Sequence, residues 1–192
     1  ILGLKKVGHA GTLDPLATGL LIVCSGAYTK QIESLMGMPK TYTGSFYLGA
    51  TTESYDLEHS PIIHSGARQV NKEELHQTAT HFVGDLWQTP PAHSAIKING
   101  KRAYKSARQG EAPEVKPRLL KIESFNILSE TLPEIDFEVS CSKGTYIRSL
   151  AFDYGEKLGT GAYLSSLRRT EIGPFKVEDA YTLQDLENII HF

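Results

Sequence analysis

Asp14 is the one acidic side chain in a stretch whose composition favours tight turns. The stretch reads Gly8-His9-Ala10-Gly11-Thr12-Leu13-Asp14-Pro15-Leu16-Ala17-Thr18-Gly19. Its glycines, proline and threonines favour turns and hydrogen bonds between side chain and backbone. The apolar run 20–24 that follows predicts a short buried strand, so the carboxylate lies at the edge of a core, where an unpaired charge is costly. Asp14 is therefore either a nucleophile or general acid/base on a rigid support, or a turn residue whose carboxylate binds its own backbone.

The rest of the sequence limits the chemistry that Asp14 can serve. The seven histidines do not form the H-E-x-x-H pattern of a zinc site, and Cys24 and Cys141 lack C-x-x-C spacing. The sequence also contains no glycine-rich phosphate loop and no G-x-S-x-G elbow of a serine hydrolase. It therefore favours aspartate chemistry without a metal or other cofactor.

Charge is distributed unevenly along a chain whose net charge is only -2. Residues 97–121 contain eight lysines and arginines against two acids, and residues 141–170 contain five against two. The acidic residues gather in 53–85 and 171–187. Separate basic patches can bind a polyanion although the total charge is near zero. The solvated faces of an ordinary domain would show the same pattern.

Length and cysteine usage indicate a globular protein of a reducing compartment. The 192 residues, 40% of them hydrophobic, suffice for one domain with a sizeable core. The sequence has no run of 18 apolar residues and no signal-peptide pattern. Cys24 and Cys141 each end an apolar run, which is typical of buried free thiols, while a disulfide between them is the less favoured alternative. We therefore expect a cytoplasmic protein that does not bind a membrane.

Periodicity predicts strands and helices that do not alternate one for one. The strands are expected at 20–24, 40–51, 94–98, 118–128, 135–141 and 163–172, and the helices at 28–36, 71–83, 102–109, 145–158 and 182–190. This order favours an α+β fold, with a mixed, largely antiparallel sheet flanked by helices. Segment 88–117 is basic, rich in turn residues and poor in core residues. It is either an arm that holds RNA phosphates or an ordinary surface hairpin and helix.

The central stretch around Asp14 resembles the catalytic motif of the TruB family of tRNA pseudouridine synthases. Three further motifs resemble that family in the same order, Lys40-Thr41-Tyr42, Lys143-Gly144-Thr145-Tyr146-Ile147-Arg148 and Leu164-Ser165-Ser166-Leu167-Arg168-Arg169. The resemblance extends from Lys6 to about Ala180. It implies the pseudouridine synthase fold and a bacterial-type enzyme that isomerises uridine-55 in the T loop of tRNA to pseudouridine.

The resemblance also implies roles for Asp14, Tyr42 and Arg148 as the catalytic residues. The reaction breaks the N-glycosidic bond of a uridine, turns the base and rejoins it through carbon, and the base must first leave the stack. Arg148 would keep the carboxylate of Asp14 ionised and aim it, and Tyr42 would offer a flat face to the base and a hydroxyl for proton transfer. Attack on the base, attack on the sugar C1′ and removal of a C2′ proton all remain open.

A second set of residues is expected to bind the substrate. It consists of His9, Lys40, Tyr146 and Leu167, with Lys101, Arg102 and Lys105 from the basic segment. In the family, a histidine at the position of His9 fills the space that the flipped base leaves. Tyr146 and Leu167 would form walls of the pocket, although core packing explains these two almost equally well.

The chain departs from the family pattern at two places. The family has an N-terminal strand and a lysine-proline-glycine loop before the central motif, and this sequence begins after them. We therefore expect a single catalytic domain over 1–192 that is incomplete at its N-terminus, with a thumb-like basic insertion at about 88–117. The family's acidic motif is matched only loosely by residues 51–56, so we assign those residues no role.

The expected partner is the T arm of tRNA, bound by a monomer that needs no protein partner. Two other classes of function compete with this hypothesis. An RNA-binding module without turnover would have no need of Asp14, Tyr42 and Arg148 together. A general aspartate-nucleophile hydrolase is disfavoured because the sequence lacks a metal-ligand pattern. Convergence of the three side chains on one cleft would favour the synthase.

Overall fold

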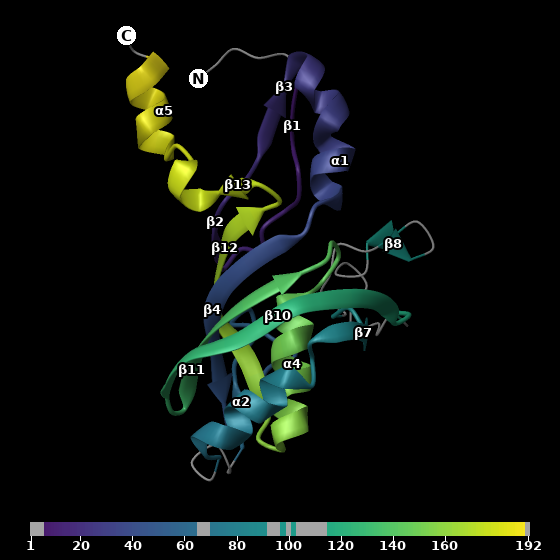
Figure 1. Ribbon diagram of the computed structural model, residues 1–192, viewed down its shortest axis with the longest axis vertical. Helices are drawn as coiled ribbons and strands as arrows, with labels where there is room; N and C mark the ends of the chain where they lie inside the picture. Colours follow the sequence, from purple (N-terminus) through teal and green to yellow (C-terminus); the bar gives the residue numbers. More distant parts are fainter. Residues whose placement is uncertain (1–5, 65–69, 92–96, 99–100, 103–114, 191–192) are drawn as a thin grey trace.

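The computed structural model, which describes residues 6–64, 70–91, 97–98, 101–102 and 115–190, is built on a curved seven-stranded sheet (Figure 1). The strands lie in the order β13 (Phe175–Lys176), β12 (Ala162–Ile172), β4 (Lys40–Leu48), β11 (Glu134–Cys141), β10 (Arg118–Thr131) and β7 (Gly84–Gln88). These neighbours pair antiparallel, while β2 (Ala17–Gly19) pairs with β12 in parallel. The α+β expectation, with a mixed and largely antiparallel sheet, is confirmed.

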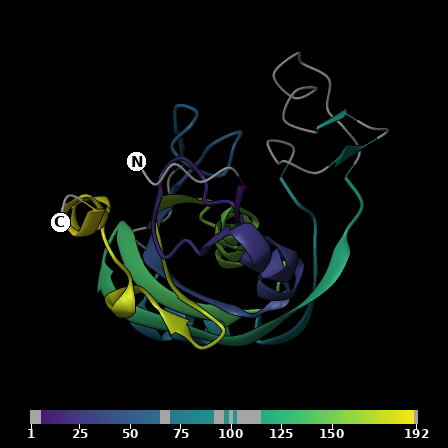
Figure 2. The ribbon, with the colours of Figure 1, turned by 90° about the horizontal axis from the view of Figure 1, so that it is seen from above.

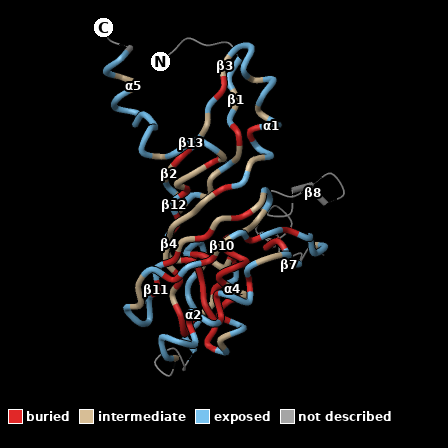
Figure 3. The backbone as a smooth tube through the Cα atoms, viewed as in Figure 1, coloured by how far each residue is buried: buried red, intermediate tan, exposed pale blue. Residues whose placement is uncertain are grey.

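The main core lies between this sheet and two helices, α2 (Lys72–Thr80) and α4 (Ile147–Leu158). Figure 2 shows the sheet curving around α4, and Figure 3 shows the buried residues gathered where the two helices meet the strands. The inward positions of β11 alternate with polar ones, as a half-buried strand requires. Aromatic rings fill the centre, where Phe46 and Phe137 lie 4.2 Å apart and the buried Tyr154 donates its hydroxyl to the carbonyl of Leu75 at 2.9 Å.

A smaller unit carries the loop of Asp14. Strands β1 (Val7–His9) and β3 (Val23–Ser25) pair antiparallel beside η1 (Gly26–Gln31) and α1 (Ile32–Gly37). Their small core contains Ala10, Cys24 and Leu35, so the Asp14 loop begins and ends on a packed support. The remaining described elements are β5 (Ala50–Thr51), β6 (Ile62–Ile63), β8 (Lys97–Ile98), β9 (Lys101–Arg102), η3 (Val177–Asp179) and α5 (Leu183–Ile190).

Three sequence predictions about elements are wrong. Run 20–24 is not one buried strand: Leu21 and Val23 are exposed, and only its end belongs to β3. Helix 28–36 is divided into the 3₁₀ turn η1 and the short α1. Helix α4 starts after Tyr146, not after Thr145, whose hydroxyl donates to the carbonyl of Ser142 at 2.9 Å.

Other expected elements are placed close to their predicted bounds or lie partly outside the described residues. Asn71 caps α2 in a capping box with Glu74, as its spacing predicts. Strand β7 was not expected at all. The predicted helix 102–109 falls almost wholly outside the described residues, and strand 94–98 is described only at its end. None of the helices in the described ranges is long and apolar enough to cross a bilayer.

Gly155 lets α4 lie directly against the start of β12. A Cβ atom at this position would collide with the backbone of Gly161 and Ala162, so that a larger residue would push the helix away from the strand. This close approach matters because α4 carries Arg148 and β12 carries Leu167 and Arg169. All three residues belong to the segments that resemble family motifs.

Candidate active site

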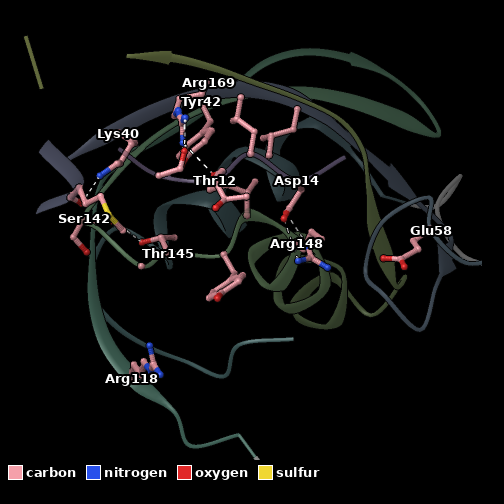
Figure 4. A pocket seen from close by; sticks show the side chains of 17 residues that line it. Thr12, Asp14, Lys40, Tyr42, Glu58, Arg118, Ser142, Thr145, Arg148 and Arg169 are labelled. Atoms are coloured by element: carbon pink, nitrogen blue, oxygen red, sulfur yellow. Dashed lines mark hydrogen bonds and ion pairs between the residues drawn. The ribbon is translucent and has the colours of Figure 1, made fainter. Parts of the chain in front are cut away.

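Asp14 and Arg148, 134 positions apart in the sequence, form an ion pair in a cleft of about 490 Å³ (Figure 4). Arg148 donates from Nε to Oδ2 of Asp14 at 2.9 Å and from Nη2 to Oδ1 at 3.4 Å. Such a two-point contact fixes the orientation of a carboxylate as well as its charge. The turn predicted by the alternative explanation is also present, since the carbonyl of Asp14 accepts the N–H of Ala17 at 2.9 Å. The carboxylate, however, is bound by Arg148.

Arg148 is held between two carboxylates. Its side chain is only 5% exposed, and its Nε lies 3.6 Å from Oδ2 of the buried Asp56. Nη1 donates to the carbonyl of Ser54 at 3.4 Å. Asp14 is more open, with 34% of its side chain exposed. The buried Asp56 thus fixes the arginine from behind, while Asp14 remains accessible to a substrate.

The turn that carries Asp56 is fastened to α4 and β12. Tyr55 has φ +63°, a conformation that is unfavourable for a bulky residue. Its ring stacks on Phe152 of α4 with centroids 4.3 Å apart, and its carbonyl accepts the N–H of Leu164 at 2.9 Å. These contacts hold residues 52–56 in place, so this segment, which matches the family's acidic motif only loosely, supplies part of the site.

Arg169 fixes the loop on which Asp14 lies. The residue is 2% exposed, and its guanidinium donates to the carbonyls of Leu20 at 2.8 Å, Gly11 at 3.2 Å and Thr12 at 3.4 Å. The carbonyl of Arg169 accepts the N–H of Leu20 at 2.8 Å. Gly19 has φ +98°, and a Cβ atom there would collide with the Arg169 backbone. The loop is therefore bound to β12 by main chain and side chain.

Tyr42 lines the same cleft and is hydrogen-bonded through its side chain to Arg169 (Figure 4). Burial raises the pKa of Tyr42 to about 12, and the charge of Arg169 opposes this shift. At neutral pH the phenol therefore keeps its proton, so Tyr42 presents a neutral ring and an O–H group to the cleft.

Lys40 lines the cleft but is engaged by the main chain. Its Nζ donates to the carbonyl of Met36 at 2.7 Å and to that of Met38 at 2.5 Å, which binds the end of α1 to β4. Burial, with the charge of Arg169, lowers the pKa of Lys40. This residue therefore stabilises the wall of the cleft, in addition to the predicted contact with substrate.

Of the other residues predicted to bind substrate, some line the cleft and some do not. Tyr146 and Leu167 line the cleft, as expected of pocket walls. His9 is exposed at the end of β1 and is not among the residues that line the cleft. Lys101 and Arg102 belong to β9, and Lys105 lies outside the described residues.

Sequence reasoning missed Asp56 and Arg169 as members of the site. Arg169 had a detectable signal, because it lies two positions after Leu167 and therefore on the same, inward face of a strand. Asp56 is the last residue of the loosely matched acidic motif. Among the residues with described positions, no group of three or more His, Cys, Asp or Glu is arranged to hold a metal ion.

Solved structures share this fold. One chain of the "Crystal Structure of a Cbf5-Nop10-Gar1 Complex" matches with a TM-score of 0.76 and 31% identity, over 100% of this chain and 48% of that chain. One chain of the "Structure of H/ACA RNP bound to a substrate RNA containing 2'-deoxyuridine" matches with a TM-score of 0.72 and 29% identity, over 100% and 46%. This chain thus spans about half the length of these solved chains. It has the α+β pseudouridine synthase fold.

Sequence comparisons identify the family. Residues 1–147 match the family model "TruB family pseudouridylate synthase (N terminal domain)", and residues 148–192 match "tRNA pseudouridylate synthase B C-terminal domain". The tRNA pseudouridine synthase B of Flavobacterium johnsoniae is 52% identical over 91% of this chain and 76% of that protein. That of Bacteroides fragilis is 51% identical over 90% and 74%. The chain belongs to the TruB family of pseudouridylate synthases, which are isomerases, and this confirms the resemblance in the sequence.

Proposed function

We propose that the protein isomerises uridine-55 in the T loop of tRNA to pseudouridine, with Asp14 as the nucleophile. The observation that carries the proposal is the convergence of Asp14, Arg148 and Tyr42 on one cleft. An RNA-binding module without turnover has no need of a carboxylate held at two points by a buried arginine. The names of the bacterial relatives support tRNA as the substrate.

The geometry supports a division of labour among the three side chains. Arg148 contacts the carboxylate of Asp14 at two points and so orients this partly exposed group in the cleft. Tyr42, protonated at neutral pH, offers its ring to the uracil and its hydroxyl to the proton transfer at carbon-5. In the net reaction the N1–C1′ bond breaks, a C5–C1′ bond forms and the proton of C5 is replaced by one on N1. The carboxylate of Asp14 can serve each of the three routes that remain open for the first step.

The cleft also fits a nucleotide that has left its stack. Its volume of about 490 Å³ lies in the range of small-molecule sites. Leu167 and Tyr146 give it apolar and aromatic walls, against which a flipped base can pack. Base flipping is therefore part of the proposal, with the energy of unstacking offset by these contacts.

Chemical mapping of pseudouridine in a tRNA transcript tests the proposal. We expect the protein to convert one uridine, at position 55, and to leave a transcript with cytidine at that position unmodified. The same protein should convert the isolated T-arm stem-loop. Modification at another position, or equal modification of both transcripts, would contradict the assigned target; no modification at all would contradict the activity.

We also propose that the protein acts as a monomer in the cytoplasm. The two buried free thiols, Cys24 and Cys141, support a reducing compartment. Burial raises the pKa of Cys141 to about 11, which keeps that thiol protonated and unreactive.

Segment 88–117 is proposed to bind tRNA phosphates. Replacing Lys101, Arg102 and Lys105 together with alanine is expected to weaken tRNA binding and to flatten its salt dependence. The slope of log K against log[salt] is negative, and each lost phosphate contact reduces its magnitude by about 0.7 to 0.9. The loss of three contacts therefore reduces the magnitude by about 2 to 2.7. Titrations of tRNA at several salt concentrations measure both effects.

A matched triple variant separates this local effect from a change of net charge. Lys72, Lys157 and Lys176 are exposed lysines that do not line the cleft. Their replacement with alanine removes the same charge and should leave the slope close to that of the wild type. If the two triple variants have the same slope, the basic segment is an ordinary solvated surface.

A further inference from the structure

Gln88 is a buried polar residue outside the group of side chains that line the cleft. It is the last residue of β7, where its backbone is paired with Arg118 of β10, and it is only 1% exposed. A buried amide needs hydrogen-bond partners for both its oxygen and its nitrogen. The hydrogen-bond partners of the Gln88 side chain connect β7 to the candidate active site.

The amide of Gln88 pairs with both backbone groups of Tyr146. Its Nε2 donates to the carbonyl of Tyr146 at 3.0 Å, and its Oε1 accepts the N–H of Tyr146 at 2.8 Å. A primary amide reproduces the donor and acceptor of a peptide group. The side chain of Gln88 therefore continues the pairing of the sheet edge onto a segment that is not a strand.

Tyr146 is the N-cap residue of α4, and its side chain forms no capping hydrogen bond with the described residues of the helix. Its carbonyl also accepts the N–H of Leu150 at 3.0 Å, the first hydrogen bond of the helix. Gln88 thus acts at the point where the helix begins. Arg148 follows two residues later, so the position of this N-cap decides where its guanidinium meets Asp14.

Two neighbouring serines, Ser149 and Ser142, fasten the same region to the sheet. Ser149 donates its hydroxyl to the carbonyl of Thr89 at 2.8 Å, directly after Gln88. Before the helix, Ser142 donates its N–H to the carbonyl of Lys121 at 2.8 Å and accepts the N–H of Lys121 on its hydroxyl at 2.9 Å. The first turn of α4 is therefore bound to β7, while the loop before it is bound to β10.

We infer that Gln88 is a positioning residue for pseudouridine formation, which acts by holding the N-cap of α4 so that Arg148 is aligned with Asp14 and Tyr146 with the cleft. This inference rests on the proposed function, because it assigns the aligned residues to that reaction. A displacement of about 1 Å at a reacting centre can lower a rate a hundredfold. Gln88 therefore affects the rate of the bound complex, without itself touching the substrate.

Gln88→Met tests the inference because methionine fills a similar volume and forms neither hydrogen bond. We expect the single-turnover rate constant at saturating protein to fall about tenfold or more, while the Kd for tRNA stays within about threefold of wild type. A merely structural role would lower the melting temperature and the fraction of protein that binds tRNA. It would leave unchanged the rate constant of the complex that does form.

Two further variants make the result decisive. Gln77→Met is the matched control, since Gln77 is exposed on α2 and its amide donates to Glu73 of the same helix at 3.3 Å. Its rate constant should equal that of the wild type. Ser149→Ala removes the hydrogen bond to the carbonyl of Thr89 and keeps the Gln88 amide. It should also lower the rate constant, by a smaller factor than Gln88→Met. It decides the question if Gln88→Met does not fold.

The outcomes separate the inference from the function on which it rests. An unchanged rate constant in folded Gln88→Met overturns the positioning role, as does a weaker Kd at an unchanged rate constant. If that variant is unfolded, an unchanged rate constant in Ser149→Ala overturns it. Lack of turnover by the wild type on tRNA overturns the proposed function instead.

Discussion

Asp14→Asn is expected to abolish pseudouridine formation while tRNA binding persists. Asparagine has nearly the same size, but its neutral amide is neither a carboxylate nucleophile nor a base. Removal of a nucleophile from a reaction of this kind lowers the rate by about a thousandfold or more. We expect tRNA binding to rely on lysines and arginines, so the loss of one carboxylate should leave the affinity close to that of the wild type. Tritium release from tRNA labelled at carbon-5 of uridine measures turnover, and filter binding measures affinity.

The control for this variant is Asp85→Asn, which makes the same change of charge at an exposed position of β7. It should retain the turnover of the wild type. Activity of Asp14→Asn within tenfold of the wild type would show that the carboxylate is not the reacting group. The ion pair with Arg148 would then be a structural contact only.

Arg148→Lys is expected to lower turnover by about 10- to 150-fold, which corresponds to the loss of about 1.5 to 3 kcal/mol for a hydrogen bond to a charged group. The guanidinium contacts Asp14 at two points, lies beside Asp56 and donates to the carbonyl of Ser54. Lysine has a single ammonium on a flexible stem and cannot reproduce this planar set of contacts. Single-turnover kinetics on tRNA measure the effect.

Arg168→Lys provides the comparison, because Arg168 is exposed on β12 and donates a 3.5 Å hydrogen bond to the hydroxyl of Thr18. That change should be nearly neutral. Equal turnover of Arg148→Lys and the wild type would refute the idea that two-point contact matters. An experimental structure in which the side chains of Arg148 and Asp14 point apart would refute the pair itself.

The fold was predictable where one short segment contained its own signal. The alternation in β11 and the capping pair of Asn71 and Glu74 are local, and both elements form as expected. Run 20–24 carries a uniform apolar signal, so periodicity could not reveal that Leu20 and Cys24 are buried while Leu21 and Val23 face solvent. Strand β7 exists because it pairs with β10, whose partner residues lie 30 to 38 positions away in the sequence, and no local pattern reports such a partner.

In the site, too, residues with a local sequence signal were predicted and residues whose partners are distant were not. Asp14, Tyr42 and Arg148 were found because each lies in a recognisable motif. Arg169 and Gln88 were not, because their partners are backbone carbonyls and N–H groups, which every residue has. A side chain that binds main chain leaves no matching residue type elsewhere in the sequence. The partners of such residues become visible only when the distant segments are placed together.

The place of β12 in the sheet has a consequence for the order in which the molecule folds. This strand lies between β4 and β13 and pairs with β4 from Ala162 to Ile172, although β4 ends at Leu48. During synthesis β4 therefore emerges long before the neighbour that covers one of its edges, and such late, non-local pairing slows folding. Because β12 also carries Arg169, the Asp14 loop obtains its final support only when the ribosome has made most of the chain. The nascent chain thus contains Asp14 well before the site around it can form.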